Sequence, residues 1–118
     1  MDRIRFLNHR DQRILLIDYT GCTEEEVGTV SDHVPEVVTR EPQGSVLLLA
    51  DFSGVKFSRE NVQHLKIATA RDRPHIKRAA WVLTENLPKA MFDSIKIFSA
   101  RKFEVFDTRE NAMDYLVS

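Results

Sequence analysis

The residues best suited to chemistry or binding follow an apolar run near the middle of the chain. Val46 to Ala50 is apolar throughout, and Asp51-Phe52-Ser53-Gly54 follows it before an expected helix start at Ser58. Backbone N–H groups at a helix start bind anions, and Lys56 and Arg59 would add positive charge there. The same carboxylate and hydroxyls also suit a turn and a helix cap, in which they bond to nearby backbone groups. The segment therefore predicts either an anion site or an ordinary turn and cap.

Eight residues of this segment are candidates for contact with a protein partner or an anion. They are Asp51, Ser53, Gly54, Lys56, Ser58, Arg59, Glu60 and Asn61. Glu60 falls in the first turn of the expected helix, where the helix dipole stabilises a negative charge by about 0.3–1 kcal/mol. It serves either as a good helix start or as a permanent charge that imitates a phosphorylated loop.

Recognised catalytic motifs are absent from the sequence. It contains no phosphate-binding loop, no dinucleotide fingerprint, no nucleophile elbow and no H-E-x-x-H pair. The four histidines, at positions 9, 33, 64 and 75, fall in separate expected elements without the close spacing of a zinc site. We therefore expect a protein without catalytic residues, metal or cofactor.

Composition and charge narrow the partners and the location. The 118 residues carry 17 basic and 18 acidic side chains, so the net charge of -1 gives no field that would attract nucleic acid. No apolar run approaches the ~18 residues of a membrane span, and the charged N-terminus lacks a signal core. A lone cysteine, Cys22, cannot form an internal disulfide, which favours the cytoplasm.

The binding segment must be positioned by alternating strands and helices. Strands are expected over residues 4–7, 13–19, 46–50, 76–83 and 103–106, and helices over 23–40, from Ser58 to the turn at 71–74, over 86–100 and from Thr108. A short link over residues 8–12 predicts an antiparallel hairpin, and Pro35 is expected to kink or interrupt the first helix.

This order predicts an α/β fold, because helical crossovers between buried strands impose parallel pairing. We expect one domain over residues 1–118, with a five-stranded, mostly parallel sheet, an antiparallel N-terminal edge hairpin and four helices. No internal repeat is apparent in the sequence. In open sheets of this kind, ligands and partners meet the carboxyl ends of the strands.

Three segments of the chain carry a resemblance to a known family: VLLLADFSGVKF in the middle, and KRAAWVL and KFEVFDTRENAMDYLV near the C-terminus. With these segments the chain resembles the STAS family of bacterial anti-sigma-factor antagonists, especially its divergent SpoIIAA-like members. The likeness covers nearly the whole chain, and D-x-S-G-V-x-F at a strand end is characteristic of such domains. The resemblance implies a non-enzymatic regulatory or protein-interaction module. Its partner would be a sigma-regulatory or kinase-like protein that meets the loop and helix after the third strand.

The sequence departs from the phosphoregulated members at one motif. Where those members carry D-S-S-G at the start of this helix, this chain has Arg59, Glu60, Asn61 and Val62. The resemblance therefore implies the regulatory scaffold without the usual serine switch.

A different function is suggested by the helix expected over residues 86–100, which has more apolar surface than one core-facing stripe needs. An apolar pocket between helix and sheet, a lid or a dimer seam would each cover the excess. The candidates are Met91, Phe92, Ile95 and Phe98. A carrier of a small apolar ligand or lipid is thus the alternative function, and a homo-oligomer is left open.

Overall fold

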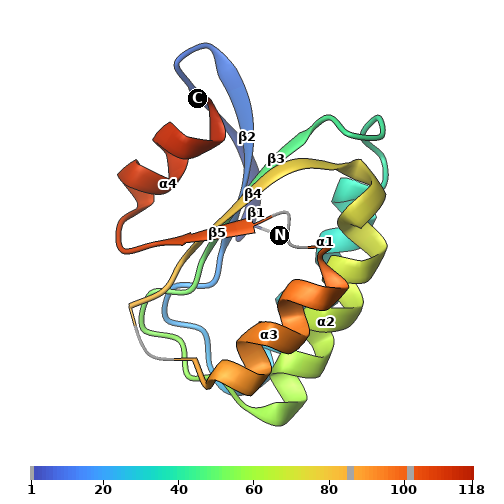
Figure 1. Ribbon diagram of the computed structural model, residues 1–118, viewed down its shortest axis with the longest axis vertical. Coiled ribbons are helices and arrows are strands. Elements are labelled where there is room, and N and C mark those ends of the chain that lie inside the picture. Colours follow the sequence, from blue (N-terminus) through green and yellow to red (C-terminus); the bar gives the residue numbers. More distant parts are fainter. Residues whose placement is uncertain (1, 85–86, 101–102) are drawn as a thin grey trace.

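A five-stranded sheet with helices on both faces forms the protein (Figure 1). The computed structural model describes residues 2–84, 87–100 and 103–118. The strands are β1 (Ile4–His9), β2 (Gln12–Asp18), β3 (Val46–Asp51), β4 (Ile76–Val82) and β5 (Phe103–Phe106). The helices are α1 (Glu24–Val38), α2 (Arg59–Asp72), α3 (Lys89–Phe98) and α4 (Arg109–Leu116), and a short 3-10 turn, η1 (Arg73–His75), follows α2.

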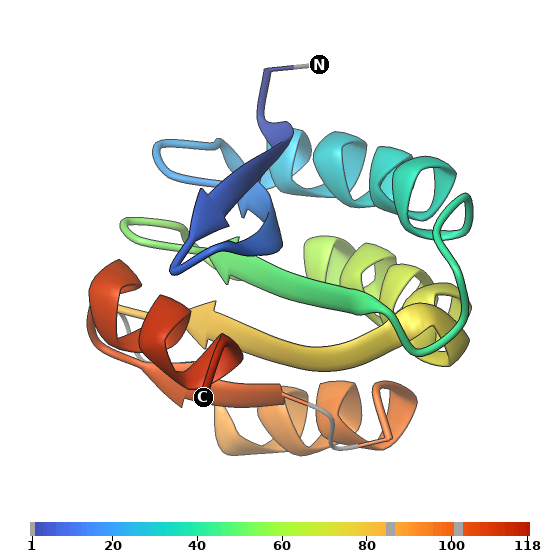
Figure 2. The same ribbon diagram turned by 90° about the horizontal axis from the view of Figure 1, so that it is seen from above.

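The strands lie in the sheet in the order in which they follow in the sequence (Figure 2). β1 pairs antiparallel with β2, and the pairs β2–β3, β3–β4 and β4–β5 are parallel. The α/β class with an antiparallel N-terminal edge is therefore confirmed. Each pair of neighbouring parallel strands is connected by one helix, and these three helices, α1, α2 and α3, cover the same face of the sheet. The last helix, α4, covers the other face (Figure 1).

Each central strand is buried on both faces because its apolar residues alternate between two cores. On β3, Leu48 and Ala50 face the side of α1, α2 and α3, whereas Leu47 and Leu49 face α4. All six residues of β3 are buried, as its continuous apolar run predicts. This strand places Asp51 at the middle of the sheet's carboxyl edge.

Helix starts follow the capping residues expected from the sequence. Thr23 and Glu26 form a capping box at α1, and the side chains of Ser58 and Thr108 cap α2 and α4. α3 begins later than expected, at Lys89, with Pro88 as its cap residue, and the expected start at residue 86 lies outside the described residues.

Two local expectations are wrong. α1 is not interrupted at Pro35, since it continues to Val38, and the N–H of Thr39 donates to the Pro35 carbonyl at 3.0 Å. Burial of Val34, Pro35 and Val38 against the sheet holds the helix together there. The hairpin link is also shorter than residues 8–12, because Arg10 and Asp11 alone make the turn with φ values of 50° and 64°.

Candidate functional site

The same four-residue pattern follows two neighbouring strands at the carboxyl edge of the sheet. Asp18, the last residue of β2, begins Asp18-Tyr19-Thr20-Gly21, and Asp51, the last residue of β3, begins Asp51-Phe52-Ser53-Gly54. Asp18 and Asp51 are paired in register, so the two copies lie side by side. Although no repeat was expected, the sheet reveals this short repeat of Asp, aromatic, hydroxyl and Gly.

The two copies also share their turn geometry. Oδ1 of Asp18 accepts hydrogen bonds from the backbone N and Oγ1 of Thr20, and Oδ1 of Asp51 accepts from the backbone N and Oγ of Ser53 at 3.0 and 2.7 Å. These are the turn contacts predicted for an Asp that leaves a strand. The rings of Tyr19 and Phe52 stack with their centroids 4.4 Å apart. The two loops are thereby joined into one rigid edge.

Glycine is required at the end of each copy. Gly21 and Gly54 have φ values of 71° and 74°, in the left-handed region where a side chain is strained. The N–H of Gly54 donates to Oγ1 of Thr84, in the chain that follows β4, at 3.1 Å. The loop after β3 is therefore held both by the loop after β2, through the stacked rings, and by the chain that follows β4.

An arginine from the other face of the sheet completes this edge. Nε and Nη2 of Arg109, the first residue of α4, lie 2.9 and 2.8 Å from Oδ2 of Asp51. Nη2 also lies 3.7 Å from Oδ1 of Asp18, and Arg5 reaches the other oxygen of Asp18 at 3.8 Å. The Asp51 side chain is only 6% exposed, so its contacts are internal and do not face a ligand.

These contacts also set the charge of Asp18. Partial burial raises the pKa of this carboxyl, but hydrogen bonds from Thr20 and the charges of Arg109 and Arg5 outweigh the burial. The pKa of Asp18 therefore lies below its ordinary value, and the side chain is ionised at neutral pH. Asp18, Asp51, Arg5 and Arg109 thus form a network of ion pairs at the carboxyl edge of the sheet, and this network holds the loops after β2 and β3 in place.

The start of α2 is locked by Asn61, which lies inside the protein and is 1% exposed. Its backbone N donates to Oγ of Ser58, and its Oδ1 accepts from the backbone N of Ser58 at 2.9 Å. Its Nδ2 donates to the carbonyl of Lys56 at 3.1 Å. Asn61 thus holds the loop before α2 by hydrogen bonds from inside the protein, and its side chain is not part of the outer surface.

Four of the eight predicted binding residues face outward. Gly54, Lys56, Arg59 and Glu60 are exposed, whereas Ser53 and Ser58 are half-buried. We call the four exposed residues the α2 start surface. The structure brings them together on one loop and helix turn above the buried Asp51 and Asn61.

Two hollows flank the α2 start surface. On one side a groove of about 390 Å³ between α2 and α3 is lined by two basic residues, Arg59 and Lys66, and by Met91. On the other side a hollow of about 140 Å³ between α1 and α2 is lined by Glu24, Glu25 and Glu60. The surface is therefore positive toward α3 and negative toward α1.

The four predicted pocket or seam residues of α3 are not gathered in one pocket. Ile95 is fully buried, and Phe92 is half-buried with its ring edge-on to Phe103 at 5.7 Å. Met91 lines the groove beside α2, whereas Phe98 is 39% exposed, with Nζ of Lys66 4.9 Å from its ring centroid. Ile97 remains exposed, so α3 keeps part of its apolar surface outside the core.

The described residues contain no group of three His, Cys, Asp or Glu side chains placed to hold a metal ion. The ring nitrogens of the four histidines have separate partners, which are Asp114, Glu36, Asp32 and the carbonyl of Glu41. In the same part of the chain, no helix is long and apolar enough to cross a membrane.

Sequence reasoning missed two structural features of this edge. The repeat of Asp, aromatic, hydroxyl and Gly was visible in the sequence as D-Y-T-G and D-F-S-G, but it is too short to stand out without the paired strands. No sequence signal connected Arg109 to Asp51, because the two residues lie in separate elements. Comparisons with models of protein families, with curated proteins and with solved structures gave no match.

Proposed function

We propose that this chain is a non-enzymatic regulatory module of the STAS type that binds a protein partner through the α2 start surface. The order of elements and the D-F-S-G-V-K-F strand end support this proposal. The partner is of the sigma-regulatory or kinase-like class implied by the resemblance. Binding at the carboxyl end of a central strand agrees with the general rule for open α/β sheets.

The observation that carries the proposal is the contrast between a locked loop and its charged outer side chains. Asp51 and Asn61 hold the loop by buried hydrogen bonds, while Lys56, Arg59 and Glu60 extend outward. A loop that is already ordered loses little conformational entropy when a partner binds. The paired positive and negative flanks would orient that partner.

The proposed module lacks a serine switch. The Ser58 hydroxyl accepts the N–H of Asn61 as the helix cap, and the Ser53 hydroxyl donates to Asp51. Phosphorylation of Ser53 would remove the hydrogen that it donates to Asp51 and would place a second negative charge beside that carboxylate. Glu60 instead keeps a constant negative charge in the first turn of α2.

Partner capture by surface variants tests this proposal. Tagged wild-type protein, Arg59→Glu and Glu60→Ala are used to capture proteins from the host lysate, and the affinity of any captured partner is then measured with purified protein. Glu110→Ala is the matched control, because Glu110 occupies the first turn of α4 after a hydroxyl cap, on the other face of the sheet. We expect at least a tenfold loss of affinity in the α2 variants and none in the control. Equal affinity of all four proteins would overturn the proposal.

Carriage of a small ligand is the second candidate function, and one observation favours it. A cavity lies between α2 and the sheet, and a buried carboxylate forms part of its wall. It is separate from the groove that Met91 lines, and it lies at the opposite end of α2 from the α2 start surface.

A further inference from the structure

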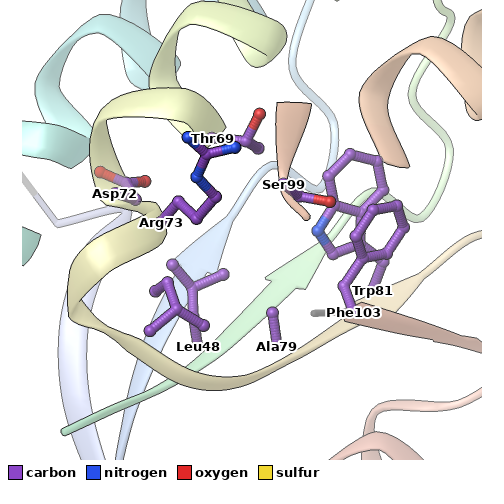
Figure 3. A pocket seen from close by; sticks show the side chains of 9 residues that line it. Leu48, Thr69, Asp72, Arg73, Ala79, Trp81, Ser99 and Phe103 are labelled. Atoms are coloured by element: carbon purple, nitrogen blue, oxygen red, sulfur yellow. The ribbon is translucent and has the colours of Figure 1, made fainter. Parts of the chain in front are cut away.

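The cavity lies under the last turn of α2, above β3 and β4 (Figure 3). Leu48, Ala79, Trp81 and Phe103 supply apolar side chains from the sheet. Figure 3 shows Asp72, at the end of α2, on the opposite side from the two rings, and the Arg73 side chain, from the start of η1, extending toward Thr69 between them in this view. The site therefore combines an apolar floor with a few polar groups, as small-molecule sites do.

Asp72 is the unusual member of this wall. The residue is 4% exposed, and among the described residues no group donates a hydrogen bond to its Oδ1. Burial raises the pKa of this carboxyl to about 7, although the charge of Arg71 acts against the rise. A buried acceptor without a partner is unfavourable, and a donor supplied by a ligand would satisfy it.

Two hydroxyl groups of the lining also favour a donor. Oγ1 of Thr69 donates to the carbonyl of Lys66 at 3.0 Å, and Oγ of Ser99 donates to the carbonyl of Lys96 at 3.1 Å. With its hydrogen already engaged, each hydroxyl oxygen can only accept from a ligand. Thr69, Asp72 and Ser99 therefore offer acceptors to a ligand in the cavity, and Arg73 is the one lining residue of this pocket, within the described part of the chain, that carries a positive charge.

The space limits the size of that ligand. About 30 Å³ is open to the centre of a water-sized molecule, and an adjoining cavity toward β2 adds about 40 Å³. The two cavities share Leu48, Thr69, Asp72 and Trp81. Because one water needs roughly 10–15 Å³ on this measure, the two together hold about five non-hydrogen atoms.

We infer that this cavity binds a small primary alkylammonium ion, whose head donates hydrogen bonds to Asp72 and whose alkyl chain lies on Leu48 and Trp81. The inference rests on the second proposed function, ligand carriage, and is independent of the α2 start surface. A charged donor makes a stronger hydrogen bond to a carboxylate than a neutral one does. Inside the protein, the attraction between the two charges is also larger than in water.

The neighbouring charges are compatible with a bound cation. Arg71 and Arg73 are exposed, so water screens their charges, whereas Asp72 is buried. Tyr19, just after β2, lines the adjoining cavity, and its hydroxyl shares a hydrogen bond with Oγ of Ser31. This hydroxyl is held neutral because burial raises its pKa far above the ordinary value. In η1, a ring nitrogen of His75 bonds to the carbonyl of Glu41.

Titration of the labelled full chain by NMR, with n-butylammonium chloride as the probe, tests the inference. 1-Butanol and sodium butyrate are the neutral and anionic comparison probes of equal size. The reporters are the methyl groups of Leu48 and Ala79 and the indole N–H of Trp81, and the Ala112 methyl, buried on the α4 face, is the internal control. Asp72→Asn removes the charge at nearly unchanged shape, and Asp107→Asn, at an exposed site after β5, is its matched control.

We expect saturable shifts of the three reporters with butylammonium at pH 8, and at least tenfold weaker binding in Asp72→Asn but not in Asp107→Asn. In wild-type protein the affinity should fall about thirtyfold between pH 8 and pH 5.5, since the ionised fraction of a group with a pKa of about 7 falls by that factor. This pH dependence tests the role of Asp72 even if the variant folds poorly.

Two results would overturn the inference. Equal binding of butanol and butylammonium, unchanged by Asp72→Asn or by pH, would reject the ammonium head and leave ligand carriage standing. Absence of saturable shifts with all three probes would reject both the inference and the second proposed function.

Discussion

Arg109 and Asp51 are 58 positions apart in the chain, yet two nitrogens of the guanidinium lie 2.8 and 2.9 Å from one carboxylate oxygen. The contact joins the first residue of α4, on one face of the sheet, to the loop that leads to α2 on the other face. Because only 6% of the Asp51 side chain is exposed, water has little access to replace this arginine. The geometry of the α2 start surface therefore depends on a residue of the last helix.

Arg109→Ala should destabilise the fold by about 2 kcal/mol, because the variant leaves a buried carboxylate without its cationic partner. The loss should be smaller than for a fully buried pair, since the Arg109 side chain is 36% exposed. Urea unfolding followed by circular dichroism measures it. Lys89→Ala, which removes an exposed ion pair with Asp93, is the control and should cost less than about 0.5 kcal/mol.

The same pair should be coupled. If Asp51 and Arg109 act on each other, the variant that combines Asp51→Ala with Arg109→Ala should lose less stability than the sum of the single variants. Additive losses would show that the two side chains stabilise the protein separately.

Asn61→Ala should cost about 2 kcal/mol of unfolding free energy, because it removes half of the capping box and a buried bond to the Lys56 carbonyl. Asn111 gives a matched control, since it occupies the same position after the Thr108 cap of α4 but has an exposed side chain. Thermal unfolding of Asn61→Ala and Asn111→Ala compares them. Similar losses in both would mean that burial of Asn61 adds nothing.

Asp72 should make the fold less stable as the pH rises. Its folded pKa, about 7, lies above the unfolded value of 3.8, so the folded state binds more protons between these values. This group's contribution is therefore full below pH 4 and declines as the pH rises toward 7, by up to about 4 kcal/mol.

Asp72→Asn isolates that contribution. The gain in stability of this variant over wild type should be larger at pH 8 than at pH 5, whereas Asp107→Asn, at an exposed site, should show no such trend. Urea unfolding at the two pH values measures both differences. A gain that is equal at pH 5 and pH 8 would contradict the raised pKa.

Gly54→Ala should destabilise the protein by roughly 1–2 kcal/mol, the cost of a left-handed residue with a side chain. No atom lies within 4 Å of the position that a Cβ would take, so the loss is one of backbone strain alone. Gly54→Asn should recover part of the loss, because asparagine tolerates this conformation. Calorimetry compares the three proteins, and an Asn variant no better than the Ala variant would contradict this explanation.

The elements themselves could be predicted because their signals are local. The apolar run of β3, the capping box at Thr23 and the caps at Ser58 and Thr108 depend on neighbouring residues, and the structure confirms each of them. Pro35 was misjudged because its effect on the helix depends on packing against the sheet, which outweighs its local penalty.

The site was predictable only in part. The sequence placed the eight candidates on one loop and helix start, but it could not separate the four that face outward from Asp51 and Asn61, which are buried. Asp72 was expected only as part of the turn that ends a helix, with no hint of burial. Its environment depends on Leu48 and Trp81, which come from two different strands.

The sequence by itself determined the alternation of strands and helices, the antiparallel edge and the place of the central loop, because periodicity and capping act within a few residues. The tertiary structure alone decided that Arg109 reaches Asp51, that two Asp loops stack side by side and that Asp72 is buried beside a cavity. These contacts join residues from distant segments, and only the packing of helices on the sheet fixes which polar groups lose water and which partners they find.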